Sequence, residues 1–181
     1  MGMRLVSVNV SLPKTVRWGA RSVRTGIYKE PVSGAIPLGR LNLEGDGQAD
    51  PTYHGGADKA VYAYPAEHYP YWERVLGKSL PFGTFGENFT VEGMSEDSVR
   101  LGDVYELEGG ARIQVTQPRT PCAKLGMKMG SMGFVREFRK AGRPGYYLRV
   151  LREGLVEAGD AVALVSSDPS RPTVKDAFAA R

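Results

Sequence analysis

The only cysteine of this chain, Cys122, stands in the segment TQPRTPCAKLG, with Arg119 three positions before it and Lys124 two positions after it. A thiolate is a nucleophile and a soft metal ligand, and a neighbouring cation stabilises it against protonation. The alternative is a buried structural cysteine, a common fate of a free thiol. Because the flanking residues are mostly polar rather than apolar, we favour a functional thiolate held beside two cations.

Positive charge is concentrated around this cysteine. Residues 119–143 contain seven Lys or Arg residues and one acidic residue, so the segment carries +6, whereas the whole chain carries +4 and the remainder is therefore −2. This distribution predicts an anionic ligand. Arg143, in the glycine-flanked turn GRPGYY, is a candidate for binding it, and a plain surface role for this residue stays equally open. For Arg136, Arg139 and Lys140 we favour a solvated helix face instead.

The two histidines and the cysteine do not have the spacing of a structural zinc site, which needs four ligands. A nucleophilic pair of Cys122 and His54 stays open, although nothing close in sequence supports it. His68 falls in a predicted helix and is interpreted as an ordinary helix residue.

Two glycine-containing segments are weaker candidates for a binding site. HGGAD contains Gly55 and Gly56, and consecutive glycines let backbone N–H groups approach an anion. The segment lacks the G-x-x-x-x-G-K-[ST] pattern of a phosphate-binding loop. In FGENFT, Glu87 and Asn88 follow a glycine, and most such pairs form turns.

Length and composition indicate one turn-rich β domain. The 181 residues suffice for one domain with a core, and 23 glycines with 12 prolines favour β structure over a helical bundle. A single cysteine excludes an intrachain disulfide and favours a reducing compartment. No apolar run approaches the roughly 20 residues that cross a bilayer, and the N-terminus alternates like a strand rather than a signal peptide. We therefore expect a cytoplasmic protein without a membrane segment.

Hydrophobic periodicity predicts a mainly β protein with a few helices. The predicted strands include residues 6–12, 16–20, 23–28, 59–64, a hairpin over 99–116 that turns at Gly109-Gly110, and strands within 145–165. The pattern V-x-x-G-D-x-x-x-L occurs at 99–107 and again at 156–164, and each Gly-Asp turn leads into a strand. Such a repeat fits a barrel that turns its corners in the same way twice.

Helices are predicted over three segments. The first runs from Pro65 to the stop at Gly77 and is kinked or split at Pro70. The second covers 131–142, with Ser131 as its N-cap, and a short third helix begins at Thr173. No linker separates domains, so one barrel domain is expected over 1–165, followed by a polar tail over 166–181.

Five segments of the chain occur in the order found in MOSC domains, which are named for the C-terminal domain of molybdenum cofactor sulfurase. They are DGQADPTYHGGADKAVYAYPAEHY (46–69), GTFGENFT (83–90), VRLGDVYEL (99–107), TQPRTPCAKLG (116–126) and GRPGYYLRVLREGLVEAGD (142–160). The chain most closely resembles the small stand-alone bacterial members of the 6-hydroxylaminopurine resistance type (YiiM-like).

This resemblance implies a closed, strongly bent β-barrel in which Cys122 corresponds to the family's characteristic cysteine. In the amidoxime-reducing relatives that cysteine ligates molybdenum held by molybdopterin, and in the sulfurases it is thought to carry sulfur as a persulfide. The implied site residues are Cys122 as metal ligand, Cys122 and His54 as catalytic residues, and Gly55, Gly56, Asp58, Lys59, Glu87, Asn88, Arg119, Lys124 and Arg143 around the cofactor. Pyridoxal phosphate binding is implied only at the level of the family. Ala123 departs from many members, which have a large residue after the cysteine.

The function that the resemblance implies is molybdenum-cofactor-dependent reduction of small N-hydroxylated compounds, such as hydroxylamino base analogues, as a detoxification step. With one cysteine the chain cannot ligate an iron–sulfur cluster, so an external protein is expected to donate electrons. The alternative is a non-catalytic sulfur or cofactor carrier that uses Cys122 as a persulfide site. A nucleic-acid-binding barrel is disfavoured, because no RNA-binding signature is present.

Overall fold

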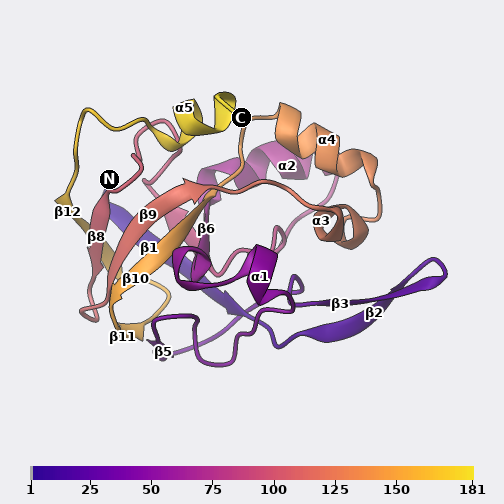
Figure 1. Cartoon of the computed structure of the whole chain (residues 1–181), viewed down its shortest axis with the longest axis horizontal. Coiled ribbons are helices and arrows are strands. Elements are labelled where there is room, and N and C mark those ends of the chain that lie inside the picture. Colours follow the sequence, from indigo (N-terminus) through magenta and orange to yellow (C-terminus); the bar gives the residue numbers. More distant parts are fainter. Residues whose placement is uncertain (1) are drawn as a thin grey trace.

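The computed structural model describes residues 2–181, and for His54 the backbone only. Figure 1 shows the strands of a barrel, helices α2, α4 and α5 along its top, and a hairpin that extends to the right. In chain order the elements are β1 (Met3–Val10), β2 (Lys14–Trp18), β3 (Arg21–Thr25), β4 (Glu30–Pro31), β5 (Ile36–Leu38), α1 (Pro51–His54), the 3-10 helix η1 (Ala57–Lys59), β6 (Val61–Pro65), the 3-10 helix η2 (Ala66–His68), α2 (Tyr69–Leu76), β7 (Phe89–Glu92), β8 (Val104–Leu107), β9 (Arg112–Pro118), α3 (Ala123–Lys128), α4 (Gly133–Lys140), β10 (Tyr146–Arg152), β11 (Gly154–Val156), β12 (Ala161–Ser166) and α5 (Val174–Ala179).

Within residues 2–181, seven strands close into a barrel, which confirms the predicted fold. Strands β12, β8, β9, β10, β6, β7 and β1 are hydrogen-bonded in that order, and β1 pairs again with β12. Register shifts in β1, β10 and β12 bend these strands, as closure of a small barrel requires. Strands β6 and β7 are parallel, so a crossover must join them, and η2, α2 and the loop after it form that crossover.

The predicted turns are present where glycine allows them. Strands β8 and β9 form the predicted hairpin, with Gly110 at φ 89°. Gly102 and Gly159, at φ 89° and 101°, begin the two repeated Gly-Asp turns. The strands that follow these turns, β8 and β12, pair with each other in the barrel wall.

The first strand departs from simple alternation. A register shift between Leu5 and Ser7 breaks the period of two, so that Leu5, Ser7 and Val8 are all buried. The strand ends at Val10, and Leu12, which continues the apolar alternation in the sequence, is 67% exposed.

An aromatic layer joins the barrel to the helices. All five residues of β6 are buried: Val61 belongs to the core inside the barrel, whereas Tyr62 and Tyr64 belong to a second cluster with Trp72 and Phe138. The Trp72 indole N–H donates to the Tyr64 hydroxyl at 2.8 Å and its ring stacks on Phe138 with centroids 5.5 Å apart. These contacts fix α2 and α4 against the wall that carries β6.

The helices agree with the sequence only in part. The chain splits at the predicted place into η2 and α2, Pro70 lies in the first turn of α2, and Gly77 ends it in the left-handed conformation. Helix α4 begins later than predicted, with Met132 as N-cap, while Ser131 accepts from the Phe134 N–H through its backbone carbonyl. Helix α3 was not predicted, because it is six residues long and contains a glycine.

The C-terminal segment packs on the barrel. The predicted short helix is present as α5, and Thr173 is its N-cap, with its hydroxyl accepting from the Asp176 N–H at 3.1 Å. Val174 is fully buried, and the Arg181 guanidinium donates to the Pro118 carbonyl at 3.2 Å. No helix within residues 2–181 is long and apolar enough to span a bilayer.

Replacing Trp72 with alanine is expected to lower the free energy of unfolding by about 3–5 kcal/mol, because the change opens a cavity and removes the partner of Tyr64. Urea denaturation followed by circular dichroism measures this. The control is Val75→Ala on the same helix, where the side chain is exposed and a change within about 0.5 kcal/mol is expected. Equal effects of the two substitutions would contradict the role of the aromatic layer.

Candidate functional site

Two cavities meet at Cys122. The first has a volume of about 100 Å³ and is lined by residues of the 25–29 and 46–50 loops together with Tyr62, Asn88 and Arg119. The second, of about 410 Å³, is bounded by Tyr53, the 117–121 segment and Arg181. Both are lined by Asp50, Lys59, Cys122 and Tyr147. The thiol is therefore reached from two sides.

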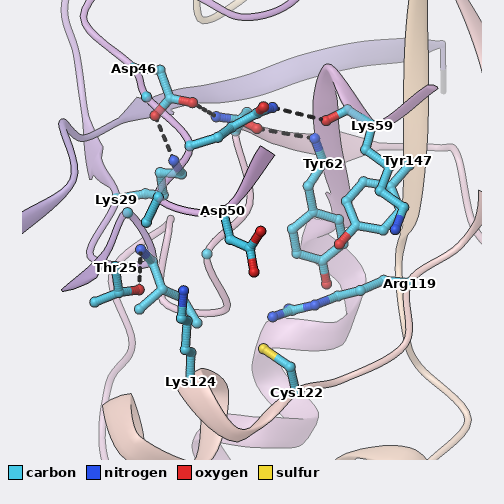
Figure 2. A pocket seen from close by; sticks show the side chains of 17 residues that line it. Thr25, Lys29, Asp46, Asp50, Lys59, Tyr62, Arg119, Cys122, Lys124 and Tyr147 are labelled. Carbon is cyan, nitrogen blue, oxygen red and sulfur yellow. Dashed lines mark hydrogen bonds and ion pairs between the residues drawn. The ribbon is translucent and has the colours of Figure 1, made fainter. Parts of the chain in front are cut away.

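Cys122 lies between the end of strand β9 and the start of helix α3. Strand β9 ends at Pro118, and after three further residues Cys122 forms the N-cap of α3 in an extended conformation, with φ −122° and ψ 171°. The residue is half-buried, and Figure 2 shows its sulfur pointing into the cavity beside Arg119. Pro118 and Pro121 restrict the backbone just before Cys122 and help to fix this geometry.

Arg119 is a buried cation at the same site, with 5% of its surface exposed. Its guanidinium donates to the Phe85 carbonyl at 2.6 Å and lies 4.5 Å from the centre of the Tyr62 ring. Burial raises the pKa of Tyr62, although Arg119 opposes the shift, and the neutral hydroxyl donates to the Pro144 carbonyl at 2.7 Å. None of the ion pairs among the described residues includes Arg119.

Two further predicted cations line the first cavity. Lys124, in the first turn of α3, points into the space opposite Asp50 (Figure 2). Lys59 lines both cavities, donates to the Tyr53 carbonyl at 2.8 Å and lies 5.5 Å from the centre of the Tyr147 ring. The structure thus brings Lys59, Arg119 and Lys124 together around the thiol.

Sequence reasoning missed a buried network beside these cations. The Lys29 ammonium contacts Asp46 Oδ1 at 2.6 Å, and the Asn88 amide donates to Asp46 Oδ2 at 3.0 Å. Asn88 also accepts from the Tyr62 N–H at 3.0 Å, so its side chain ties the cavity wall to β6. Lys29 and Asp46 lie in a loop-rich region without periodicity, and no local signal marks them.

Glu87 is fully buried and does not line either cavity. It accepts hydrogen bonds from the Tyr69 hydroxyl, from the Gly83 N–H at 2.9 Å and from the Phe85 N–H at 3.1 Å. Burial raises the pKa of Glu87, and the hydrogen bonds from Tyr69 and Gly83 counteract part of the rise. The carboxyl therefore shapes the loop whose Phe85 carbonyl receives Arg119.

The His-Gly-Gly segment supports the first cavity from outside. A Cβ on Gly55 would lie 2.0 Å from Gln48 Oε1, so glycine leaves room for Gln48, which lines the cavity. Asp58 accepts from the Arg149 guanidinium at 2.6 Å and is exposed, away from both cavities. His54 ends α1, and its side chain lies outside the described part of the chain.

Arg143 lies away from the two cavities at Cys122. Its guanidinium donates to His68 Nδ1 at 2.9 Å, and the other ring nitrogen of His68 contacts Glu96 at 2.6 Å. His68 is 7% exposed, so it is a buried, hydrogen-bonded residue rather than an ordinary helix residue as interpreted from the sequence. Arg143 also lies 4.5 Å from the Tyr71 ring centre and lines neither cavity at Cys122.

Lys128 anchors helix α3, which follows Cys122, to two neighbouring loops. Its ammonium donates to the Ile27 carbonyl at 3.2 Å and to the Gly83 carbonyl at 2.9 Å. Burial is the main cause that lowers the pKa of Lys128 to about 8; Glu87 opposes this, and nearby cations such as Arg119 add to it. Within the described residues, no group of three or more His, Cys, Asp or Glu side chains is arranged to hold a metal ion.

The model of the MOSC domain family matches residues 50–163, a range that includes Cys122 and most of the cavity lining. The chain belongs to the MOSC domain family. Among solved structures, YiiM from Geobacillus stearothermophilus superimposes with a TM-score of 0.79 and 39% identity, over 96% of this chain and 80% of that protein.

Curated relatives agree with this assignment. The chain is 47% identical over 162 residues to YflK of Bacillus subtilis (strain 168), covering 90% of this chain and 73% of YflK. It is 38% identical to YiiM of Escherichia coli (strain K12), covering 86% and 70% respectively. It is also 32% identical to a protein named "Reductase" of Gibberella moniliformis (strain M3125 / FGSC 7600), covering 79% of this chain and 26% of that protein.

Lys128 is expected to make stability depend on pH. Between about pH 8 and its unfolded pKa near 10.5, the unfolded chain binds more protons at this residue than the folded one. The free energy of unfolding therefore gains a contribution that rises with pH in this window. Urea denaturation at about pH 7.5 and about pH 9.5 should show this rise in the native protein and a smaller one in Lys128→Met.

The control for this comparison is Lys140→Met, which removes an exposed lysine of α4 and should leave the native pH dependence intact. An identical rise in native protein and Lys128→Met would show that Lys128 is not the group responsible.

Proposed function

We propose that this protein binds molybdenum cofactor and reduces N-hydroxylated compounds, with hydroxylamino base analogues as the substrate class. The observation that carries the proposal is the pairing of Cys122 with Arg119, a buried guanidinium that faces the same cavity and takes part in none of the ion pairs of the described chain. A buried cation without a counter-ion favours the binding of an anion.

The donor set suits the cofactor. Cys122 provides a free thiol, and a cysteine sulfur is a suitable ligand for a soft metal centre. Lys29 is already paired with Asp46, but Lys59, Arg119 and Lys124 remain to contact anionic groups. The second cavity, about 410 Å³, lies within the usual range of ligand pockets, roughly 300–1,000 Å³, and opens on the same thiol. On this proposal the metal would lie beside Cys122 and the pterin would occupy the adjoining cavity space.

When bound, the cofactor would supply two-electron redox chemistry at the metal. An N-hydroxylated amine R–NHOH takes up two electrons and two protons, the N–O bond breaks, and R–NH2 and water are released. Cys122 would hold the metal, and Arg119 would hold an anionic oxygen in place. Lys124 and Asp50, which both line the first cavity, would be candidates to pass protons to the departing hydroxyl. The Tyr147 ring, shared by both cavities, would orient a flat substrate.

The comparisons support this proposal at the level of the family. A relative that covers four-fifths of the chain is named a reductase, and YiiM proteins share the fold over nearly the whole chain. We place the protein in the cytoplasm, where a free cysteine stays reduced. The second candidate function, sulfur carriage on Cys122, is favoured by the access to the thiol from two cavities, which an acceptor molecule would need.

Cys122→Ser is expected to abolish both bound molybdenum and reduction of 6-hydroxylaminopurine. The protein would be produced in a host that makes the cofactor, and metal content, pterin content and dithionite-driven turnover would be measured on native and variant proteins. Near-equimolar molybdenum in the native protein and none in the variant is the expected result. The urea midpoint should stay unchanged, because serine replaces a half-buried thiol of similar size.

Absence of metal and turnover in the native protein, together with a mass increase of one sulfur atom on Cys122, would reject the reductase proposal in favour of sulfur carriage.

Arg119→Gln is expected to weaken retention of the cofactor about tenfold or more, because a hydrogen bond to a charged group contributes about 1.5–3 kcal/mol. Molybdenum per protein after extensive dialysis measures the effect. Arg136→Gln, on the exposed face of α4, is the matched control and should retain native occupancy. Native occupancy in a folded Arg119→Gln protein would show that the guanidinium does not hold the cofactor.

A further inference from the structure

Residues 14–25 form an arm that stands apart from the barrel. Among the residues that the structure describes, strands β2 and β3 pair only with each other, from Lys14 opposite Thr25 to Trp18 opposite Arg21. Figure 1 shows this hairpin extending away from the strands of the barrel at the right of the molecule. A two-stranded hairpin is marginally stable on its own in water, so a surface of this kind is suited to contact with a partner.

The arm is uniformly basic. It contains Lys14, Arg17, Arg21 and Arg24 and no acidic residue, so its +4 equals the net charge of the whole chain. All four cations are exposed, and none takes part in an ion pair within the described residues. Four unpaired cations on one projecting element attract an acidic surface and repel a basic one.

Apart from its charged side chains, the arm exposes only a small apolar surface. Val16 and Val23 face each other across the two strands and are only half-buried, and Trp18 at the tip is 37% exposed. An exposed tryptophan among arginines is typical of a protein–protein interface, because Trp and Arg often contribute most of the binding energy there. A single aromatic side chain offers no series of stacking platforms for successive bases, so a protein partner is favoured over a nucleic acid.

The base of the arm is part of the candidate site. Thr25 ends β3, and Thr25, Gly26 and Ile27 line the first cavity at Cys122. Lys14, at the start of the arm, and Lys128, on the helix of the thiol, lie 4.6 and 5.6 Å from the centre of the Tyr28 ring. A partner bound along the arm would therefore sit beside the opening that leads to the thiol.

We propose that this arm is the docking surface for an acidic electron-transfer protein that supplies the reducing electrons. The inference rests on the proposed reductase function, for which two one-electron donors must be oxidised for each R–NHOH reduced, with two protons taken from solvent. The arm places positive charge where such a donor approaches the site. A second copy of the chain is a poorer occupant, because outside its own +4 arm the chain is net neutral and offers no excess of negative charge.

The test compares two reductants on the molybdenum-loaded protein. A plant-type [2Fe–2S] ferredoxin, kept reduced by its own reductase, needs a docking surface, whereas dithionite does not. The variant Arg17→Glu/Arg21→Glu/Arg24→Glu reverses the charge of the arm, and Arg136→Glu/Arg139→Glu/Lys140→Glu makes the same charge change on the exposed face of α4.

The arm variant is expected to raise the KM for ferredoxin about tenfold or more, in keeping with the size of electrostatic steering, and to leave the dithionite-driven rate unchanged. The KM of the native protein should rise with salt. An equal KM in the native protein and the arm variant, or an equal effect of the α4 variant, would overturn the inference. So would a native protein that dithionite drives and ferredoxin does not.

Binding of oxidised ferredoxin, measured by calorimetry at low salt, separates this inference from the proposed function. If neither reductant gives turnover, the reductase proposal fails. In that case, ferredoxin binding that is lost in the arm variant and kept in the α4 variant would still support the docking surface. Tighter arm-dependent binding of a DNA duplex than of ferredoxin would overturn it in favour of nucleic acid. A dimer in sedimentation that the arm variant abolishes would overturn it in favour of self-association.

Discussion

The candidate site depends on one buried cation, Arg119. Removing a guanidinium from water is costly unless its donors are satisfied, and here the Phe85 carbonyl and the face of Tyr62 contribute to that. Glu87 accepts from the Gly83 and Phe85 N–H groups and so holds the loop around this carbonyl in place. Cys122 follows Arg119 by three residues, so fixing the arginine also limits where the thiol can lie.

The surrounding structure brings distant segments to this point. The parallel pairing of β6 and β7 forces the chain through a helical crossover, and the loop that ends the crossover delivers Asn88 next to Tyr62. Asn88 then binds the backbone of β6 and the Asp46 carboxylate at once. The cavity is therefore a consequence of barrel closure and crossover together, and the aromatic layer around Trp72 stabilises both.

Much of the architecture could be predicted from local patterns. The β8–β9 hairpin, the split before α2 and the cap at Thr173 follow from glycine, proline and threonine acting on neighbouring backbone, whose effects extend over only a few residues. Helix α3 could not be predicted in this way. A Cβ on its Gly126 would lie 2.9 Å from Val135 Cγ2, so the glycine that weakens the helix locally is needed for its close packing against α4.

The sequence by itself determined that a single thiol stands between Arg119 and Lys124 in a strongly basic segment. It also determined that the chain is a turn-rich β protein. Both properties depend only on residue type and short-range spacing. Only the tertiary structure decided which charges meet that thiol. It brought in Lys29 and Asp46 from a loop without periodicity, placed Arg143 on His68 instead, and left the cations of the β2–β3 arm in solvent. The reason is physical: a cavity is made of side chains from segments far apart in sequence, and their meeting depends on strand order and register, which no local pattern encodes.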